Sequence, residues 1–220
     1  MRNIIEKYFP EMGIDISWYS KKKITPNIPE KDNLDNLDDL DILVKKCKKC
    51  NLYKTRNNTV FGEGSHNSDI MIIGEAPGKE EDDSGKPFIG RAGKLLTEFL
   101  KSISLDRRSV FITNTVKCRP PENRNPEMTE IKSCSDYLDQ QIAFIKPKVL
   151  VLLGKIAANR MLGEDKPISE LRLKKFFVEK YDIPLIVFYH PAYILRSPLQ
   201  KKKVWDDLQY LKTIIGSHGS

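Results

Sequence analysis

IIGEAPGKEEDDSGKPFIGRAG, which covers residues 72–93, starts as an apolar run and breaks into a long loop of glycine, proline and carboxylates. The apolar run begins at residue 69 and has the length and β-branched content of a strand. A helical pattern takes over at residue 92, where the loop ends. A connector needs only a few residues, so a loop of this length and composition indicates a functional site between a strand and a helix.

Four short apolar runs of this strand type occur along the chain. They cover residues 69–74, 109–116, 148–154 and 184–190, and helical patterns cover residues 92–103, 125–145, a stretch from about 155, and 199–215. Nearly continuous apolar strands that alternate with helices predict a parallel sheet covered on both faces. We therefore expect an α/β fold with a central four-stranded, mostly parallel sheet flanked by helices.

The composition of the 220-residue chain is that of a globular protein with a basic surface. Hydrophobic residues make up 40% and charged residues 30%, and the chain is long enough to bury a core without disulfides. It has no apolar run long enough for a membrane span and no signal-like start, so we expect a cytoplasmic location. The net charge of +7 favours a polyanionic partner such as nucleic acid, although an excess of lysine also suits a solvated surface.

Three parts of the chain differ in pattern. Residues 1–33 form an N-terminal extension of unknown role that ends in a linker rich in Pro, Lys and Asn. Residues 34–216 hold the predicted strands and helices and form the expected domain, and residues 217–220 are a tail. The domain opens with leucines at positions 34, 37, 40 and 43, which predict an amphipathic helix that leads into the first cysteines.

Polar or conformationally special residues follow the ends of the predicted strands. The GEAPG motif follows the first strand, Asn114 lies near the end of the second, the third ends at Gly154, and the fourth leads to His190. In parallel sheets, ligands bind outside the carboxyl ends of the strands. We therefore expect these residues to share one binding edge.

The four cysteines suggest a metal centre. Cys47 and Cys50 form a C-x2-C pair, whereas Cys118 and Cys134 are separated by fifteen residues. In a reducing compartment such thiols favour a metal over disulfides. The spacing fits only half of a zinc ribbon, and an iron–sulfur cluster accepts irregular spacing, so it predicts a metal without choosing between zinc and iron. The alternative is four unrelated buried side chains, which the exposed-looking loop around Cys118 disfavours.

The loop after the first strand offers two candidate ligand-binding side chains. Glu75 lies where a carboxylate at a strand end could position a water molecule or bond a ligand. Phe88 either plugs the core or provides a stacking surface for a flat ligand. The other acids, Glu80, Asp82 and Asp83, are expected to be solvated. The GEAPG motif lacks the P-loop lysine, so it supports a nucleotide-phosphate site only weakly.

Asn114 and His190 are the candidates on the other strands. Asn114 interrupts a strand, and a buried amide without partners costs about 1–3 kcal/mol. It therefore either caps a neighbouring loop or reads a ligand with its donor and its acceptor. His190 ends a buried strand and is either structural or a donor to a developing anion. The cations at positions 196 and 201–203 either contact phosphate or begin a solvated helix.

Three motifs and the cysteines together resemble the type-4 uracil-DNA glycosylases, the iron–sulfur members of the uracil-DNA glycosylase superfamily. The motifs are GEAPGKEEDDSGKPFIGRAGKLL, NTVKCRPPENRNP and HPAYILR, and the likeness covers about residues 34–215. It implies a uracil-DNA glycosylase-like three-layer sandwich and hydrolytic removal of uracil from DNA. It also implies a [4Fe–4S] cluster on Cys47, Cys50, Cys118 and Cys134.

The resemblance also implies roles for residues at matching positions. Phe88 would stack on a flipped uracil, Asn114 would read its edge, and His190 would meet the departing base. Glu75 would join His190 in catalysis, and the loop after His190 would press into the duplex. The positions implied for substrate binding are Glu75, Ala76, Pro77, Gly78, Glu81, Phe88, Asn114 and His190, and those for DNA contact are Arg91, Tyr193, Leu195 and Arg196.

The expected function is therefore that of a base excision repair glycosylase that releases free uracil and leaves an abasic site. We expect uracil-containing DNA as its partner, a monomeric state and no membrane association, and leave open a sliding clamp as a protein partner. The alternatives are a non-catalytic iron–sulfur DNA-binding module, a small-molecule enzyme that binds nucleotide phosphates at GEAPG, and a glycosylase for another deaminated base.

Overall fold

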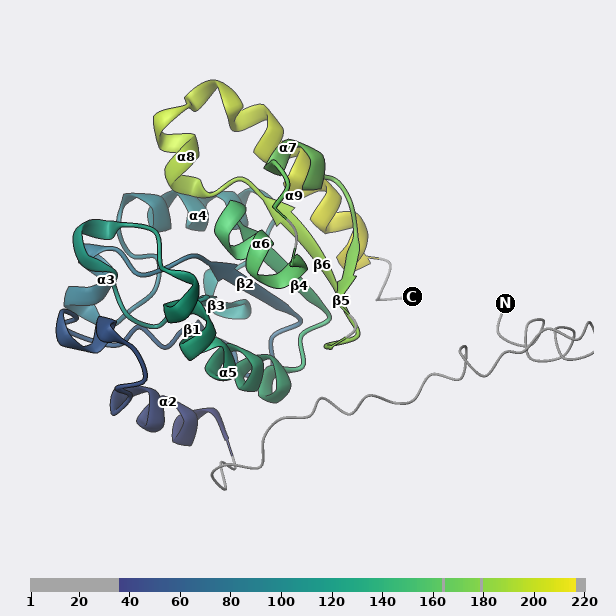
Figure 1. Ribbon diagram of the computed structural model, residues 1–220. Coiled ribbons are helices and arrows are strands. Elements are labelled where there is room, and N and C mark those ends of the chain that lie inside the picture. Colours follow the sequence, from purple (N-terminus) through teal and green to yellow (C-terminus); the bar gives the residue numbers. More distant parts are fainter. Residues whose placement is uncertain (1–35, 164, 179, 217–220) are drawn as a thin grey trace, which may run out of the picture.

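The centre of the molecule is a six-stranded mixed sheet with the strand order β1-β3-β2-β4-β6-β5 (Figure 1). The computed structural model describes residues 36–163, 165–178 and 180–216, so the predicted extension and tail lie outside the described residues. The strands are β1 (Glu63–Gly64), β2 (Ile70–Gly74), β3 (Phe111–Asn114), β4 (Val149–Leu153), β5 (Phe176–Val178) and β6 (Ile183–Phe188). The single domain expected over residues 34–216 stays a prediction.

The four predicted strands form the parallel centre of this sheet. β3, β2, β4 and β6 lie side by side and pair in parallel. The expected number of strands was wrong, because β1 and β5 add an antiparallel strand at each edge. β1 has two residues and β5 has three, which is too short for a hydrophobic pattern to predict them.

Helices follow most of the strands. They are α2 (Leu37–Lys45), α3 (Lys79–Ser84), α4 (Arg91–Ser102), α5 (Met128–Ile145), α6 (Lys155–Leu162), α7 (Ile168–Leu171), α8 (Pro191–Arg196) and α9 (Lys201–Gly216). Short 3-10 turns are η1 (Asn51–Lys54), η2 (Arg107–Ser109), η3 (Pro121–Asn123) and η4 (Pro198–Gln200). The four predicted helices correspond to α4, α5, α6 and α9. The predicted amphipathic helix before the first cysteines is α2, which Asn36 caps by accepting from the backbone of Asp38 and Asp39.

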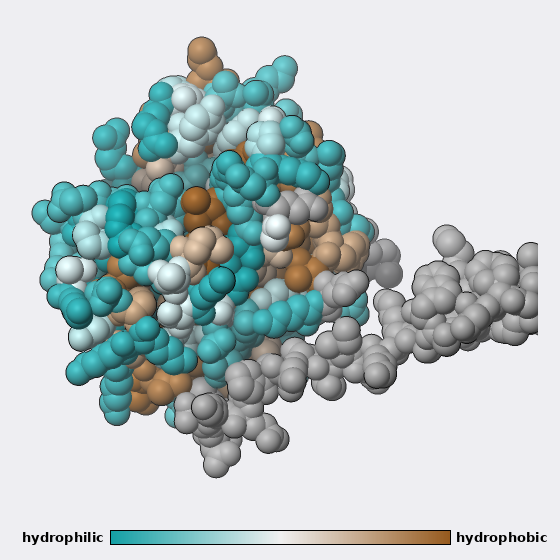
Figure 2. All heavy atoms as spheres, viewed as in Figure 1, coloured by the Kyte–Doolittle hydropathy of each residue, from teal (hydrophilic) through white to brown (hydrophobic). Residues whose placement is uncertain are grey.

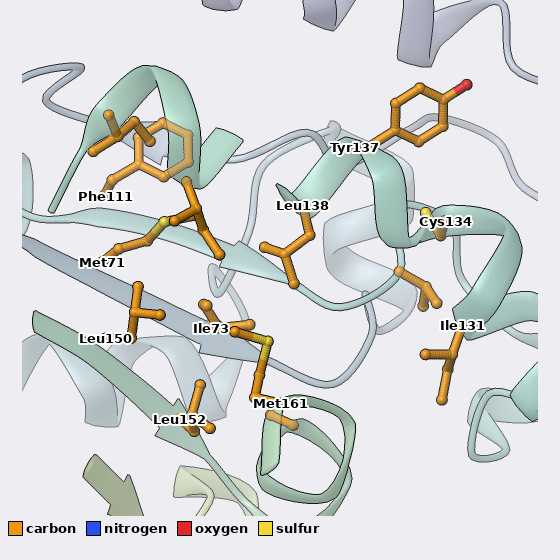
Figure 3. Packing of buried hydrophobic residues seen from close by; sticks show 14 of the residues in the cluster. Met71, Ile73, Phe111, Ile131, Cys134, Tyr137, Leu138, Leu150, Leu152 and Met161 are labelled. Atoms are coloured by element: carbon orange, nitrogen blue, oxygen red, sulfur yellow. The ribbon is translucent and has the colours of Figure 1, made fainter. Parts of the chain in front are cut away.

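The sheet is buried on both faces, so the molecule has three layers. On β2, Met71 and Ile73 face a layer of α2, α5 and α6, whereas Ile70 and Ile72 face α4, α8 and α9. Figure 3 shows the first of these interfaces, where side chains from the strands meet those of α5 and α6. Burial on both faces explains why most positions of the central strands are apolar, with Thr113 and Asn114 of β3 as buried polar exceptions.

The carboxyl ends of the parallel strands meet at one edge of the sheet. Gly74 lies opposite Asn114 in the β2–β3 ladder. The N–H of Gly154, which follows β4, donates to the carbonyl of Phe188 in β6 (2.9 Å), and His190 follows two residues later. The strand ends therefore share one edge of the sheet, as the sequence predicted, and ligand binding at this edge stays a prediction. None of the helices in the described ranges is long and apolar enough to cross a membrane.

Candidate active site and cysteine pocket

Gly74, the last residue of β2, is the point where two site residues converge. A Cβ placed on Gly74 would lie 2.4 Å from Oδ1 of Asn114 and 2.5 Å from Cζ of Phe88. Both distances are shorter than atoms in van der Waals contact allow, so a glycine is required for the amide and the ring to approach this strand end. The sequence-predicted residues Asn114 and Phe88 are thus brought together.

Phe88 is held in an unusual backbone conformation. Its φ angle is 50°, in the left-handed region that residues other than glycine seldom adopt. Its carbonyl packs so closely on α4 that a Cβ at Gly93 would lie 1.7 Å from the carbonyl oxygen. The side chain is 7% exposed and belongs to the core, and its ring lies 5.7 Å from that of His190, tilted by 35°. Phe88 therefore plugs the core and also borders the binding edge.

Asn114 is buried with an unused acceptor. Its residue is 1% exposed, and Oδ1 has no hydrogen-bond partner in the part of the chain that the structure describes. Such an unpaired buried group costs about 1–3 kcal/mol and calls for an explanation. The alternative in which this oxygen caps a neighbouring loop is not what the structure shows. An acceptor kept for a ligand donor fits the observation.

His190 caps the start of α8. Its Nδ1 accepts a hydrogen bond from the N–H of Ala192 (3.1 Å), so the neutral ring carries its proton on Nε2. Burial, and then the positive charge of Arg196, lower the pKa of His190 to about 4, against an opposing effect of Glu81. At neutral pH the ring is thus an uncharged imidazole with an Nε2–H donor.

Glu75 directly follows β2, and its backbone is anchored. Its carbonyl accepts from Oγ1 of Thr115 (2.6 Å) and from the N–H of Val116 (3.3 Å). The half-buried side chain forms no hydrogen bond or ion pair within the described ranges, and burial raises the pKa of its carboxyl. The backbone of Glu75 is thus held in place while its carboxylate oxygens are available, so they can accept a hydrogen bond from a water molecule or a ligand.

Glu81 fastens two stretches of the long loop to each other. Its Oε1 accepts from the N–H groups of Ile89 (2.9 Å) and Gly90 (3.0 Å), and its Oε2 accepts from the N–H of Gly78 (3.2 Å). The sequence of the loop alone did not distinguish Glu81 from the acidic residues next to it. A usable signal was its place three residues after the helix-capping Gly78, where glutamate often bonds the cap.

Asp82 contradicts the expectation that the other acids of the loop are solvated. Asp82 is 1% exposed, and its carboxylate accepts from the backbone N–H groups of Asn57 (3.0 and 3.1 Å) and Asn58 (3.3 Å). The reason is that α3 turns one side towards the segment before β1. Glu80 and Asp83 are exposed, as expected.

The four cysteines line one pocket. It lies between the end of α2, η1, the chain after β3 and α5. Cys134 projects from α5 near Tyr137 (Figure 3). Cys118 is 6% exposed, which corrects the impression of an exposed loop, because only the residues after it reach solvent. Within the described ranges, no three His, Cys, Asp or Glu side chains form a site for a single metal ion.

N–H groups donate to sulfur atoms of this pocket. Nη1 of Arg56 donates to Sγ of Cys118 (2.9 Å), and its Nη2 donates to the carbonyl of Cys47 (3.0 Å). The N–H of Lys117 donates to Sγ of Cys134 (3.4 Å). Burial raises the pKa of the Cys134 thiol to about 11, so a thiolate there needs a positive partner. Four thiols with N–H donors around them fit a metal–sulfur centre.

Comparisons with known proteins place the chain in a family. Residues 61–209 match the model of the uracil DNA glycosylase superfamily. The type-4 uracil-DNA glycosylase of Archaeoglobus fulgidus is 42% identical over 75% of this chain and 86% of that protein. The type-4 enzymes of Sulfurisphaera tokodaii (45% identical, over 74% and 77%) and Thermotoga maritima (40%, over 76% and 88%) are similar too. The chain belongs to the type-4 uracil-DNA glycosylases.

These comparisons confirm both the family and the activity that the motifs predicted. The chain is a uracil-DNA glycosylase, a DNA N-glycosylase of base excision repair. The fold agrees in class, with a mostly parallel sheet between two layers of helices. The individual roles of the site residues are not assigned by this membership and stay predictions.

The residues of this uracil-DNA glycosylase that we expect to contact DNA lie on α4 and α8, which pack against each other. Arg91 is exposed at the start of α4, and Arg196 is exposed at the end of α8. Leu195 is 38% exposed, and Tyr193 is half-buried and stacks on Tyr189 with ring centroids 5.1 Å apart. Their contact with DNA stays a prediction.

Two residues near the candidate sites in the chain were not singled out from the sequence. Leu199, which is 95% exposed in η4, lies between α8 and the lysines that begin α9. Figure 2 shows that hydrophilic residues dominate the face of the molecule seen in this view. Leu199 could have been singled out from the sequence, because it is an apolar residue between Pro198 and a run of lysines. Lys117 is completely buried, and nothing in the sequence distinguishes it from a surface lysine.

Proposed function

We propose that this glycosylase hydrolyses the N-glycosidic bond of uracil in DNA with the residues of the binding edge. The observation that carries the proposal is the buried, unpaired Oδ1 of Asn114, which lies beside the ring of Phe88 at the strand end. The ring of His190 lies next to that of Phe88. An acceptor, an aromatic ring and a neutral donor in one place suit a flat, polar base.

The substrate base has to leave the DNA stack before it reaches this edge. Enzymes that act on a base flip the nucleotide into a pocket and compensate for the lost stacking. We propose that Phe88 supplies part of this compensation, which is about 1–3 kcal/mol for a base on an aromatic ring. Its backbone is already fixed by α4, which supports a rigid stacking surface.

Asn114 is proposed to distinguish uracil from cytosine. Its Oδ1 would accept from uracil N3–H, and its amide N–H would donate to O4. Cytosine presents the opposite pattern of donor and acceptor, which leaves buried polar groups unpaired. A site of this kind can reject the wrong base by roughly 10⁴-fold or more.

Thymine differs from uracil by one methyl group, which hydrogen bonds cannot detect. A close wall at C5 has to exclude it, and we propose that the loop of Ala76, Pro77 and Gly78 forms this wall. Glu81 would support the wall, because its carboxylate holds the N–H groups of Gly78 and Ile89. Support through the backbone fits Glu81 better than a direct contact of its own, since both of its oxygens are engaged.

Cleavage leaves negative charge on uracil and positive charge on the sugar. We propose that Nε2–H of His190 donates to uracil O2 and stabilises the anion, an effect worth about 3–4 kcal/mol for a preorganised donor. The low pKa of His190 supports this role, because the ring stays neutral and its other nitrogen is engaged by Ala192. Glu75 would position the attacking water molecule or favour the cationic sugar.

The cysteine pocket is proposed to hold a [4Fe–4S] cluster through Cys47, Cys50, Cys118 and Cys134. Four thiols arranged around a pocket with N–H donors to sulfur support this proposal. The hydrolysis transfers no electrons, so the reaction needs no redox role for the cluster. Its role would be to cross-link the chain segments that carry the cysteines. The cytoplasmic location, the monomeric state and a clamp partner stay predictions.

The experiment that tests the proposed function is uracil release from a labelled oligonucleotide with a single uracil. Thymine and cytosine at the same position are the controls, and a His190→Ala protein is measured alongside. We expect release of uracil alone, and a more than tenfold lower single-turnover rate for the variant with DNA binding retained. An equal rate would remove His190 from catalysis. No release by the cluster-loaded protein would contradict the function and favour another base or a binding module.

A further inference from the structure

Lys117 is a lysine with a buried side chain that lies between the cysteine pocket and the strand end of Asn114. It is 1% exposed, and it lines the pocket together with Cys118 and Cys134. Lysine is almost never fully buried without a partner of opposite charge. Among the described residues, its ammonium forms no ion pair with a carboxylate. The observation therefore calls for a function.

The three N–H bonds of the Lys117 ammonium are all used. Nζ lies 2.6 Å from Oγ1 of Thr113, 2.8 Å from the carbonyl of Asn114 and 2.6 Å from Oε1 of Gln141. Thr113 and Gln141 each donate to the carbonyl of Phe61 (2.7 and 2.9 Å), so the oxygens that face Lys117 act as acceptors. Three acceptors match the three donors of an ammonium group.

The backbone of Lys117 belongs to the cysteine side. Its N–H donates to Sγ of Cys134 (3.4 Å), its carbonyl accepts from Val60 (2.7 Å), and the next residue is Cys118. Lys117 therefore donates to a cysteine sulfur from its main chain and to the strand end that carries Asn114 from its side chain. No other hydrogen bond between the described residues joins these two places so directly.

We propose that Lys117 is a positioning residue that couples the metal–sulfur centre to the uracil-reading amide of Asn114. The inference rests on the proposed function of both sites. The main-chain N–H of Lys117 donates to Sγ of Cys134, so a cluster that holds this sulfur would also hold the backbone of Lys117. The side chain then holds the end of β3, so that Oδ1 of Asn114 faces the base. A hydrolase would thus use its cluster to orient base recognition.

The test is a double-mutant cycle between Lys117→Met and Asn114→Ala in the cluster-loaded protein. Methionine keeps most of the length of the side chain and removes its donors. If Lys117 acts through Asn114, Lys117→Met lowers the single-turnover rate roughly 10- to 100-fold in the parent, as a misplaced binding group does. In the Asn114→Ala background the further loss should stay below about threefold.

A second readout follows the cluster itself. Contacts to metal ligands from the outer shell typically change metal retention by roughly 10- to 100-fold. We expect Lys117→Met to lose the visible absorbance and the bound iron faster than the parent in a chelator, by on the order of tenfold. The matched control is Lys148→Met, because Lys148 is an exposed lysine paired with Asp69 (3.0 Å). It should change neither the absorbance decay nor the rate.

Each outcome decides the inference. Equal rate losses in both Asn114 backgrounds, or full activity of Lys117→Met, would overturn it. If Lys117→Met does not fold, Thr113→Val removes one acceptor and should show a smaller loss that also vanishes in the Asn114→Ala background. The proposed function fails in a different way, because the unmodified protein would then release no uracil.

Discussion

Burial acts in opposite directions on the two residues proposed for catalysis. It lowers the pKa of His190 to about 4 and raises that of Glu75, because in each case it disfavours the charged form. His190 is therefore neutral above about pH 5. The carboxyl of Glu75 ionises at a higher pH than that of an ordinary glutamate. Between pH 6.5 and about 4 the unfolded chain binds a proton that folded His190 does not. The free energy of unfolding consequently falls as the pH drops through this window.

The pH dependence of uracil release should report on Glu75. We expect the single-turnover rate to rise with pH, with a midpoint above the ordinary glutamate value of 4.5, and not to decline through titration of His190 near neutral pH. Glu75→Gln should lower the rate by roughly 10²–10⁴-fold and remove the acid limb. An unchanged acid limb in this variant would show that a different group titrates.

At the scale of elements, α3 links two parts of the site through adjacent carboxylates. Glu81 binds backbone N–H groups on both sides of the long loop, whereas Asp82 binds the segment before β1. The helix has six residues, too few to be stable alone, so these contacts define where it lies. The long loop after β2 is therefore held by the contacts of α3 as well as by β2.

Loss of the Glu81 carboxylate should loosen this loop. We expect Glu81→Ala to reduce the free energy of unfolding by about 2 kcal/mol, the range for hydrogen bonds to a charged group. For a chain of this size that corresponds to a melting temperature about 4–8 °C lower. The uracil excision rate should fall with it, because the loop proposed as the wall beside the base would move.

The matched control for Glu81→Ala is Asp83→Ala on the same helix. The exposed carboxylate of Asp83 bonds only the exposed side-chain amide of Asn57 (2.8 Å). Its removal should change the free energy of unfolding by no more than about 0.5 kcal/mol. Equal melting temperatures for the two variants, measured by circular dichroism, would contradict the role of Glu81 in holding the long loop together.

At the scale of the whole molecule, the cysteine pocket joins segments that are far apart in the chain. Cys47 and Cys50 follow α2, Cys118 follows β3, and Cys134 lies on α5. All of them belong to or pack against the core on one face of the sheet. A cluster in this pocket would therefore brace that layer as a cross-link does.

Removal of the cluster should destabilise the molecule. In the chain-entropy picture, a cross-link that closes a loop of roughly a hundred residues contributes about 4–5 kcal/mol. We therefore expect the melting temperature to fall by about 10–20 °C after iron removal by oxidation and chelation. Uracil release should fall too. An apo protein that stays folded at the same temperature and remains fully active would contradict a bracing cluster.

The central strands and main helices could be predicted because their patterns are local. The run of β4, residues 149–153, is apolar at every position, since this strand is covered on both faces. The edge strands β1 and β5 and the buried Asp82 could not be predicted. They owe their state to partners elsewhere in the chain, such as the backbone of Asn57 for Asp82.

The sequence by itself determined the fold class, the edge of the sheet where the candidate site residues lie, the cysteines and the family. These follow from periodicity and from motifs that lie within short stretches. Only the tertiary structure decided that Oδ1 of Asn114 is unpaired, that Nε2 of His190 carries the proton, and that Lys117 is buried. The physical reason is that hydrogen bonding and burial depend on atoms from distant segments, which no local pattern contains.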